Sequence, residues 1–406
     1  MQVVEKSQSF SVCFSFGEKL YSLAGTEAIG SRKGMKTEVV KLDTPLDREQ
    51  VRKIVRVIEK GGIAAVPTET VYGLAGRALP DTIKRLDVLK GRTSDKRYTL
   101  HIGMKEELTK YVPKVPPPMM KLANRFWPGP LTIVFELDQT SLQTPQSIFS
   151  KEIYEVLYLD GSIGIRCPDS IICREILSTS ILPIMIPSAN PTSCKPAISI
   201  REVLEYYDGQ IELVVDADSQ ECRYKKSSSV VKYGANGIEI LREGVLASDL
   251  ITKNAIFKIL FVCTGNTCRS PMAESICKKI LSDKLGCSID SLERFGYKVE
   301  SAGVFAAEGI SASKEADIIC REYGASLENH KSRLLTKQLL EESDVIFAMA
   351  QSHLDDLKRM TTAKNEICLL DKNGEVPDPV GQDVAAYRKC AEQIERALRE
   401  RINEIL

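Results

Sequence analysis

Histidine and paired cysteines are scarce in this chain of 406 residues. It holds three histidines, His101, His330 and His353, and none of its twelve cysteines lies in a CxxC pair. Protein zinc sites are built from closely spaced cysteine and histidine ligands, so this composition argues against a zinc centre. A chain of this length is also no small disulfide scaffold. The cysteines therefore indicate free thiols in a reducing, cytoplasmic setting.

An excess of charge and a long apolar run are also missing. The chain has 55 lysine and arginine residues and 55 aspartate and glutamate residues, so no overall charge attracts it to nucleic acid. This balance does not exclude a local basic groove. No apolar run approaches the roughly 20 residues of a membrane span, and the start of the chain carries no signal-peptide pattern. We expect no membrane association.

The composition that is present is typical of folded protein. Hydrophobic residues make up 43% and charged residues 27% of the chain, and its length suggests two or three domains. Strands alternate with helices in both halves, which predicts α/β folds. We expect a flexible tail at 1–34, a first α/β domain at 35–245, a linker at 246–256 and a second at 257–406. Within the first domain, 138–161 is expected to be an irregular surface insertion.

The clearest motif of the second domain is CTGNTCRSPMAE at 263–274. It follows the apolar stretch KILFVC, and Pro271 suits the first turn of a helix. A loop between a strand end and a helix N-terminus presents backbone N–H groups to an anion. Arg269 offers a planar fork to two phosphoryl oxygens, and the loop favours a thiolate at Cys263. Asp378, in VPDPVG, is the candidate general acid.

This pattern closely resembles the low-molecular-weight protein tyrosine phosphatase family over 257–406. SAG at 301–303, NHKSR at 329–333 and DP at 378–379 also match. The resemblance implies a Rossmann-like parallel sheet, phosphoprotein substrates and no cofactor, with Cys263 as nucleophile, Arg269 as phosphate ligand and Asp378 as general acid. It also implies that Cys268 caps the nucleophile as a disulfide under oxidation. The phosphate loop would further include Thr264, Gly265, Asn266, Thr267 and Ser270.

Two details within this resemblance bear on the substrate. Thr267, where tyrosine-directed members usually carry a bulky apolar residue, and SAGVFA at 301–306 resemble the arginine-phosphatase branch. Val380 also stands where an aromatic side chain often holds a phenyl ring. We expect phosphoarginine first and phosphotyrosine second. Arsenate reductases of the same fold usually read SQMAE and need a cysteine relay, whereas this loop reads PMAE, and Cys320, Cys368 and Cys390 fall inside predicted helix or strand.

The first domain carries a separate set of polar motifs. PTETVYGL at 67–74 is rich in hydroxyl groups, KGR at 90–92 ends a predicted helix, and PSAN at 187–190 ends an apolar strand. Two cations around a glycine suit a polyphosphate. Polar side chains at the carboxyl end of a strand are well placed to bind a ligand.

Together these motifs resemble the threonylcarbamoyl-AMP synthase (YrdC-like) family over 36–245, which has a twisted mixed α/β sheet. WPGPLT at 127–132, IRCPD at 165–169 and ILREG at 240–244 add to the match. The resemblance implies that L-threonine, bicarbonate and ATP with Mg²⁺ give a threonylcarbamoyl adenylate. A separate transferase would use this product to make threonylcarbamoyladenosine in tRNA.

The resemblance also assigns the residues of this pocket. Lys90 and Arg92 would hold phosphates, and Ser188 and Asn190 the nucleotide and carbamate. The remaining predicted binding residues are Thr68, Thr70 and Tyr72 at the threonine end, with His101, Arg166 and Arg242 nearby. The chain departs from the family at Thr93, Arg97, Tyr98 and Thr192-Ser193, next to the ATP site.

Two alternatives to a bifunctional enzyme remain open. The first domain could be an RNA-binding module, which would leave the phosphatase as the one catalytic part. The second domain could instead be a catalytically silent scaffold.

Overall fold

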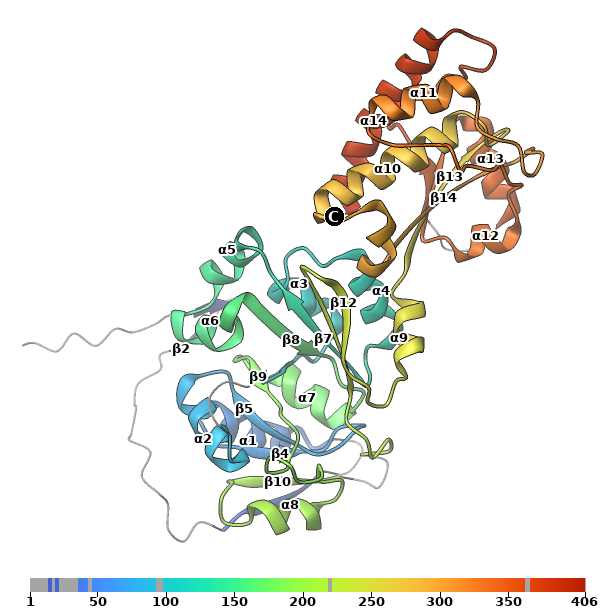
Figure 1. The fold of residues 1–406 in the computed structure, drawn as a ribbon. Helices are drawn as coiled ribbons and strands as arrows, with labels where there is room; N and C mark the ends of the chain where they lie inside the picture. The colour runs from blue at the N-terminus through green and yellow to red at the C-terminus, as the bar shows by residue number, and fades with distance from the viewer. Residues whose placement is uncertain are drawn as a thin grey trace, which may run out of the picture.

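The structure is a computed structural model that describes residues 14–16, 19–21, 36–42, 46–92, 98–217, 221–361 and 366–405. Figure 1 shows two folded parts joined end to end, with the N-terminal part at the lower left. Within the predicted tail, 1–34, β1 (Phe14–Phe16) and β2 (Lys19–Tyr21) pair antiparallel. The rest of that tail lies outside the described residues.

The N-terminal part contains one ten-stranded sheet in the order β12-β11-β7-β8-β6-β9-β5-β4-β10-β3. The sheet contains both parallel pairs, such as β10·β3, and antiparallel pairs, such as β7·β8, so the predicted mixed sheet is confirmed. Its strands are β3 (Glu38–Leu42), β4 (Ala64–Val66), β5 (Gly73–Arg77), β6 (Leu100–His101), β7 (Leu131–Glu136), β8 (Ser162–Arg166), β9 (Ile184–Met185), β10 (Leu213–Ala217), β11 (Ser229–Gly234) and β12 (Gly237–Arg242).

Helices pack on this sheet through apolar stripes. α1 (Arg48–Glu59) buries Val51, Ile54, Val55 and Ile58, which recur at helical spacing, and Asp47 caps its first turn. The other helices of this part are α2 (Pro80–Lys90), α3 (Leu108–Tyr111), α4 (Pro117–Phe126), α5 (Gln139–Ile148), α6 (Lys151–Leu157), α7 (Ile171–Thr179), α8 (Ile200–Tyr207) and α9 (Ser248–Asn254), with short 3-10 turns η1 (Lys105–Glu107) and η2 (Leu159–Gly161).

The expected irregular insertion at 138–161 is wrong, because this segment forms α5 and α6. Asp138 caps α5 by accepting a hydrogen bond from the Ser141 amide at 2.7 Å. Phe149 and Ile153 are buried in the main core of the N-terminal part. The segment therefore contributes to the core as well as to the surface.

Residues 246–256, expected to be a linker, contain α9. Ile251 is completely buried and belongs to the core of the N-terminal part, together with Ala255. The segment is therefore a structural element of that part, packed against α4.

The C-terminal part is a four-stranded sheet in the order β14-β13-β15-β16. All of its pairs are parallel, as the sequence predicted. Helices cover both faces, with α10, α11 and α14 on one face and α12 and α13 on the other. The elements are β13 (Phe257–Cys263), α10 (Arg269–Leu285), η3 (Ile289–Phe295), β14 (Tyr297–Gly303), α11 (Lys314–Glu322), α12 (Lys337–Glu342), β15 (Val345–Ala348), α13 (Gln351–Met360), β16 (Glu366–Leu369) and α14 (Val384–Ile405).

The two parts meet at the amino ends of the C-terminal strands. Lys121 Nζ on α4 donates to Asp344 Oδ2 at 2.6 Å, just before β15, and to the Ile256 carbonyl at 2.7 Å. At the turn of the β11–β12 hairpin, a Cβ on Gly237 would stand 2.6 Å from the Arg294 carbonyl of η3. The hairpin turn therefore lies directly against the C-terminal part.

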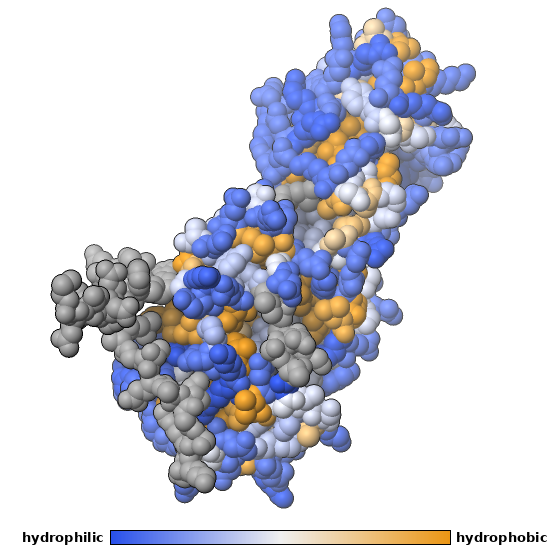
Figure 2. Space-filling model, turned by 60° about the vertical axis from the view of Figure 1, so that its left-hand side comes forward, coloured by the Kyte–Doolittle hydropathy of each residue, from blue (hydrophilic) through white to orange (hydrophobic). Residues whose placement is uncertain are grey.

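Most of the surface in Figure 2 is hydrophilic, and hydrophobic residues form small separate groups on both parts. Among the described residues, no helix combines the length and the apolar character that crossing a bilayer requires.

Candidate active sites

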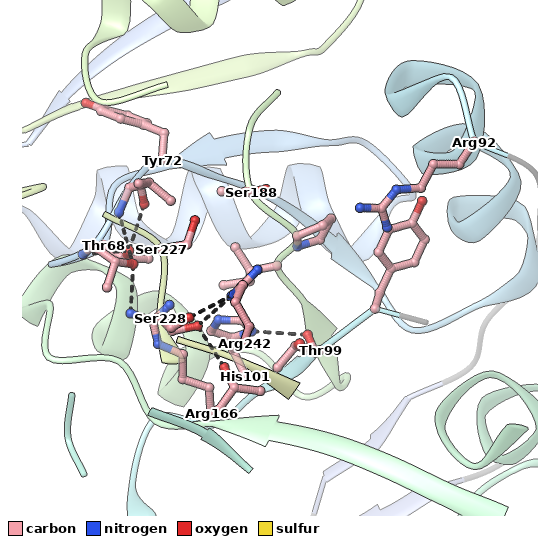
Figure 3. A pocket seen from close by; sticks show the side chains of 17 residues that line it. Thr68, Tyr72, Arg92, Thr99, His101, Arg166, Ser188, Ser227, Ser228 and Arg242 are labelled. Carbon is pink, nitrogen blue, oxygen red and sulfur yellow. Dashed lines mark hydrogen bonds between the residues drawn. The ribbon is translucent and has the colours of Figure 1, made fainter. Parts of the chain in front are cut away.

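A pocket in the N-terminal part is lined mainly by hydroxyl groups and arginines (Figure 3). Eight of the ten residues predicted for this site line it: Thr68, Thr70, Tyr72, Arg92, His101, Arg166, Ser188 and Arg242. Among the residues that the structure describes, no carboxylate lines it. The pocket is therefore suited to an anionic ligand.

Arg166 is held in the pocket by a buried ion pair. Its Nη2 donates to Glu69 Oε1 at 2.6 Å and to Thr70 Oγ1 at 2.9 Å. The side chains of Arg166 and Glu69 are 6% and 0% exposed, so this pair is shielded from solvent. Thr68 Oγ1 lies 2.8 Å from Thr70 Oγ1 and extends the same network. Glu69 is a residue that the sequence analysis missed, although PTETVYGL contains it.

Lys90 lies behind the pocket wall. It is 1% exposed, and its Nζ donates to the carbonyls of Ser188 at 2.5 Å and Asn190 at 2.7 Å. Burial, helped by nearby Arg92, lowers the pKa of Lys90 to about 7. In this structure Lys90 supports the turn that contains Ser188, and its direct contact with phosphate stays a prediction.

Asn190 also faces this turn. Its Oδ1 accepts from Ser188 Oγ at 2.6 Å, and its Nδ2 donates to the carbonyls of Pro191 and Cys194. Ser188 lines the pocket and Asn190 does not. Of the two residues, Ser188 therefore reaches the pocket, and Asn190 fixes its position.

Arg242 is fixed by hydroxyl groups that the sequence analysis did not assign. Its Nε and Nη2 donate to the carbonyl and Oγ of Ser228, at 3.0 and 3.1 Å. Ser228 Oγ also lies 3.0 Å from Thr132 Oγ1. Thr132 and Ser228, together with Ser227, line the pocket. WPGPLT contains Thr132, so that motif was the available signal.

Arg92 and His101 occupy the remaining walls. The Arg92 guanidinium lies over the Tyr98 ring, 5.5 Å from its centre, and Tyr98 Oη donates to Asp87 at 2.6 Å. Burial lowers the pKa of His101 to about 3, so its imidazole is neutral. Of the family departures, Tyr98 contacts Arg92, whereas Thr93 and Arg97 lie outside the described residues.

The loop after β13 surrounds the Cys263 sulfur with donors. Ser270 Oγ lies 3.0 Å from Cys263 Sγ, and the Asn266 amide donates to it at 3.2 Å. Cys263 is 3% exposed and lies at the carboxyl end of β13, where α10 begins. The arrangement stabilises negative charge on the sulfur.

Asn266 holds the loop in shape from its centre. It adopts a left-handed backbone conformation, with φ of 54°, which asparagine tolerates better than most residues. Its side chain donates to Ser270 and Ser301 and accepts from the Arg333 amide at 2.9 Å. His330 Nε2 lies 2.8 Å from its carbonyl. SAG and NHKSR are thus brought to the back of the loop.

Arg269 and Asp378 meet at the open side of the loop. Arg269 Nη2 donates to Asp378 Oδ2 at 2.5 Å, and its Nη1 donates to the Val376 carbonyl at 3.4 Å. The side chain of Arg269 is 7% exposed and that of Asp378 47%. The structure therefore brings together the three residues predicted to be catalytic, at the carboxyl end of β13.

Cys268 lies beside the loop in contact with two hydroxyl groups. Tyr387 Oη is 3.2 Å and Ser313 Oγ 3.4 Å from its sulfur. Burial and the contact with Cys268 raise the pKa of Tyr387 to about 12. Burial also raises the pKa of Cys320 and Cys390 to about 12, which keeps both thiols protonated and argues against a cysteine relay.

The described residues contain no group of three or more histidine, cysteine, aspartate or glutamate side chains placed to bind a metal ion. Each of the eleven cysteines in that part of the chain is a free thiol.

Comparison with known proteins identifies both parts. The Sua5/YciO/YrdC family model, described as telomere recombination, matches residues 56–244, and that of the low molecular weight phosphotyrosine protein phosphatases matches 258–405. A threonylcarbamoyl-AMP synthase of Pyrococcus abyssi is 31% identical over 220 residues, which are 53% of this chain and 60% of that protein.

Two bacterial phosphatases match the C-terminal part. A protein-arginine-phosphatase of Geobacillus stearothermophilus is 35% identical, covering 34% of this chain and 89% of its own length. The low molecular weight protein-tyrosine-phosphatase PtpB of Staphylococcus haemolyticus is 34% identical, covering 34% of this chain and 91% of its own. The chain therefore joins a member of the Sua5/YciO/YrdC family to a member of the low molecular weight phosphotyrosine protein phosphatase family.

Proposed function

We propose that the N-terminal part makes threonylcarbamoyl adenylate from L-threonine, bicarbonate and ATP. The observation that carries the proposal is the pocket in which Arg92, Arg166 and Arg242 converge with hydroxyl groups, inside the segment that matches the Sua5/YciO/YrdC family. Three guanidinium groups suit a triphosphate and a carboxylate. The name of the Pyrococcus relative supports the same reaction.

In this proposal the pocket positions the two reactants. The threonylcarbamate oxygen attacks the α-phosphorus of ATP, the bond to the β-phosphate bridge breaks, and pyrophosphate leaves. Such a transfer depends on positioning and on neutralising charge, which the arginines supply together with the Mg²⁺ that ATP brings. Thr68, Thr70 and Arg166 would hold threonine. The adenylate then passes to a separate tRNA-modifying transferase.

Pyrophosphate release tests the synthase proposal. The full chain should release pyrophosphate only when ATP, threonine and bicarbonate are all present, and Arg166→Leu should reduce the rate at least about 100-fold. A chain that binds RNA but releases no pyrophosphate would support the alternative RNA-binding module and would refute the synthase.

We propose further that the C-terminal part is a cysteine-dependent protein phosphatase. The carrying observation is the convergence of Cys263, Arg269 and Asp378 on one phosphate loop. The Cys263 thiolate would attack phosphorus to form an S–P bond, while the bond to the leaving group breaks and Asp378 donates its proton to that group. Water then attacks the phosphocysteine, Asp378 takes a proton, and phosphate leaves with the thiolate restored.

Phosphoarginine in proteins is the preferred substrate in this proposal, and phosphotyrosine is second. The support is Thr267 together with SAGVFA, and Val380 offers no aromatic ring for a phenyl group. Relatives of both names are almost equally similar to the chain, so the loop residues decide the proposal. The free thiols of the described residues suit the cytoplasmic setting in which we place both activities.

Two variants test the phosphatase proposal. Cys263→Ser should abolish hydrolysis of phosphoarginine, phosphotyrosine and an aryl phosphate. Thr267→Ile should lower phosphoarginine hydrolysis and raise phosphotyrosine hydrolysis. Near-normal activity of Cys263→Ser would refute the mechanism, and an unchanged substrate ratio in Thr267→Ile would remove the basis of the arginine preference.

A further inference from the structure

One histidine of the C-terminal part contacts the phosphate loop and has no role in the mechanism above. His353 is the third residue of α13, which begins immediately after β15. Because β15 is the parallel neighbour of β13, the loops that follow both strands lie at the same sheet edge. His353 Nε2 lies 2.9 Å from Oγ1 of Thr264, the residue that follows the nucleophile.

Packing alone does not explain a histidine at this position. His353 is 4% exposed, and its Nδ1 is buried without a hydrogen-bond partner among the described residues. A buried unpaired polar atom destabilises a fold, whereas a leucine would fill the same space without that cost. Burial and nearby Arg269 lower the pKa of His353, which favours a neutral ring. The hydrogen bond to Thr264 is therefore what this histidine provides and a leucine would not.

Thr264 lies at the open side, or mouth, of the phosphate loop, next to the contact between Arg269 and Asp378. Its side chain is exposed, unlike those of Cys263 and Arg269. Its Oγ1 is 3.5 Å from Arg269 Nη2, the same nitrogen that binds Asp378 at 2.5 Å. Since Asp378 is the proposed donor of the leaving-group proton, the Thr264 hydroxyl is a near neighbour of the leaving atom.

Two exposed apolar side chains complete this mouth. Phe305 is 77% exposed, and its amide donates to the Thr264 carbonyl at 3.0 Å. Val380 is 61% exposed, and its amide donates to Asp378 Oδ1 at 3.2 Å. The mouth thus offers apolar surface for an aliphatic stem and a hydroxyl oxygen for a polar end. An arginine side chain has both features, and a phenyl ring has only the first.

We propose that the Thr264 hydroxyl, positioned by His353, accepts a hydrogen bond from the guanidino N–H of phosphoarginine and so selects this leaving group over an aryl group. Thr264 is the specificity residue, and His353 is a positioning residue that acts through it. When the hydroxyl donates its proton to Nε2 of the neutral His353 ring, its two lone pairs accept from Arg269 Nη2 and from the substrate. This inference rests on the proposed phosphatase function and deepens it.

The test compares phosphoarginine with 4-nitrophenyl phosphate in the full chain. Thr264→Val removes the hydroxyl at nearly constant shape, and His353→Leu removes its partner. Each should lower kcat/KM for phosphoarginine about tenfold more than kcat/KM for 4-nitrophenyl phosphate, because only the first substrate loses a hydrogen bond to the hydroxyl. The double variant should lose no more than either single variant, because both changes remove one interaction. His353→Gln, which keeps a polar group, should recover most of the loss.

A control on the same helix separates positioning from folding. Leu357→Ala opens a cavity at a completely buried position of α13, so it should lower stability and leave the ratio of the two kcat/KM values unchanged. The proposal is overturned if both substrates lose activity by the same factor in His353→Leu, or if the two single losses multiply in the double variant. A fully active Cys263→Ser would instead refute the phosphatase mechanism itself.

Discussion

Buried charge decides how much two residues of the synthase pocket contribute to stability. Lys90 and Glu69 are both almost or completely buried. Glu69 has a charged partner, whereas the partners of Lys90 Nζ among the described residues are two carbonyls. A paired buried charge loses its compensation when the partner is removed, whereas an unpaired one shifts its pKa. The two residues therefore respond to different experiments.

Glu69→Gln should destabilise the N-terminal part by about 3 kcal/mol, because it leaves the buried Arg166 charge unpaired. The measurement is denaturant unfolding followed by fluorescence of Trp127, the single tryptophan of the chain, which is buried in the N-terminal core. Glu205→Gln removes the partner of Arg201 in an exposed pair and should change stability by less than about 0.5 kcal/mol. Equal effects of the two substitutions would contradict the prediction.

Lys90 should make stability depend on pH. Its pKa is about 7 in the folded chain and ordinary in the unfolded chain, so between pH 7 and pH 10 the unfolded chain binds more protons. Stability from this group therefore rises with pH across that window. The free energy of unfolding of the wild type, relative to Lys90→Met, should increase by a few kcal/mol from pH 7 to pH 10. A constant difference would show that the lysine is not held in the buried environment described above.

Some contacts of single residues could not be predicted from the sequence. The loop residues, the three predicted catalytic residues and most pocket residues could be predicted because they belong to contiguous motifs. The contact of Glu69 with Arg166 and that of His353 with Thr264 join residues 97 and 89 positions apart. No local spacing encodes such a contact, which exists only once the strands are aligned in the sheet.

At the scale of elements, the alternation of strands and helices predicted both sheets, but two segments were misread. The run that forms α5 is polar and contains Pro145, so it shows no apolar stripe, and its anchor Phe149 follows the helix end. α9 has seven residues and buries mainly Ile251. Short helices that are fixed by one or two side chains give too little periodicity to recognise.

Ile251→Ala tests whether α9 is part of the N-terminal core. Removing a completely buried isoleucine should lower stability by about 2–4 kcal/mol, whereas a flexible linker would tolerate the change. Leu250→Ala on the same helix, where the side chain is 44% exposed, should have little effect. Trp127 fluorescence during denaturant unfolding reads both variants, and similar midpoints for the two would place α9 outside the core.

At the scale of the whole molecule, the contact through Lys121 and Asp344 joins the two parts. Both side chains are about three-quarters buried, and Asp344 Oδ2 also accepts from the Lys258 amide at 2.8 Å. A double-mutant cycle with Lys121→Met and Asp344→Asn should give a coupling free energy of about 1 kcal/mol. The exposed pair Lys337–Glu341 is the matched control and should give less than about 0.5 kcal/mol. Equal couplings would show that the contact adds nothing to the joint.

The direction of the C-terminal strands determines from which side each candidate site is reached. Their amino ends face the N-terminal part, so the phosphate loop at their carboxyl ends points away from it. The phosphoprotein substrate and the tRNA-modifying transferase proposed above would therefore approach different ends of the described chain. Binding at one proposed site would leave the other accessible, so the two proposed activities can proceed at the same time.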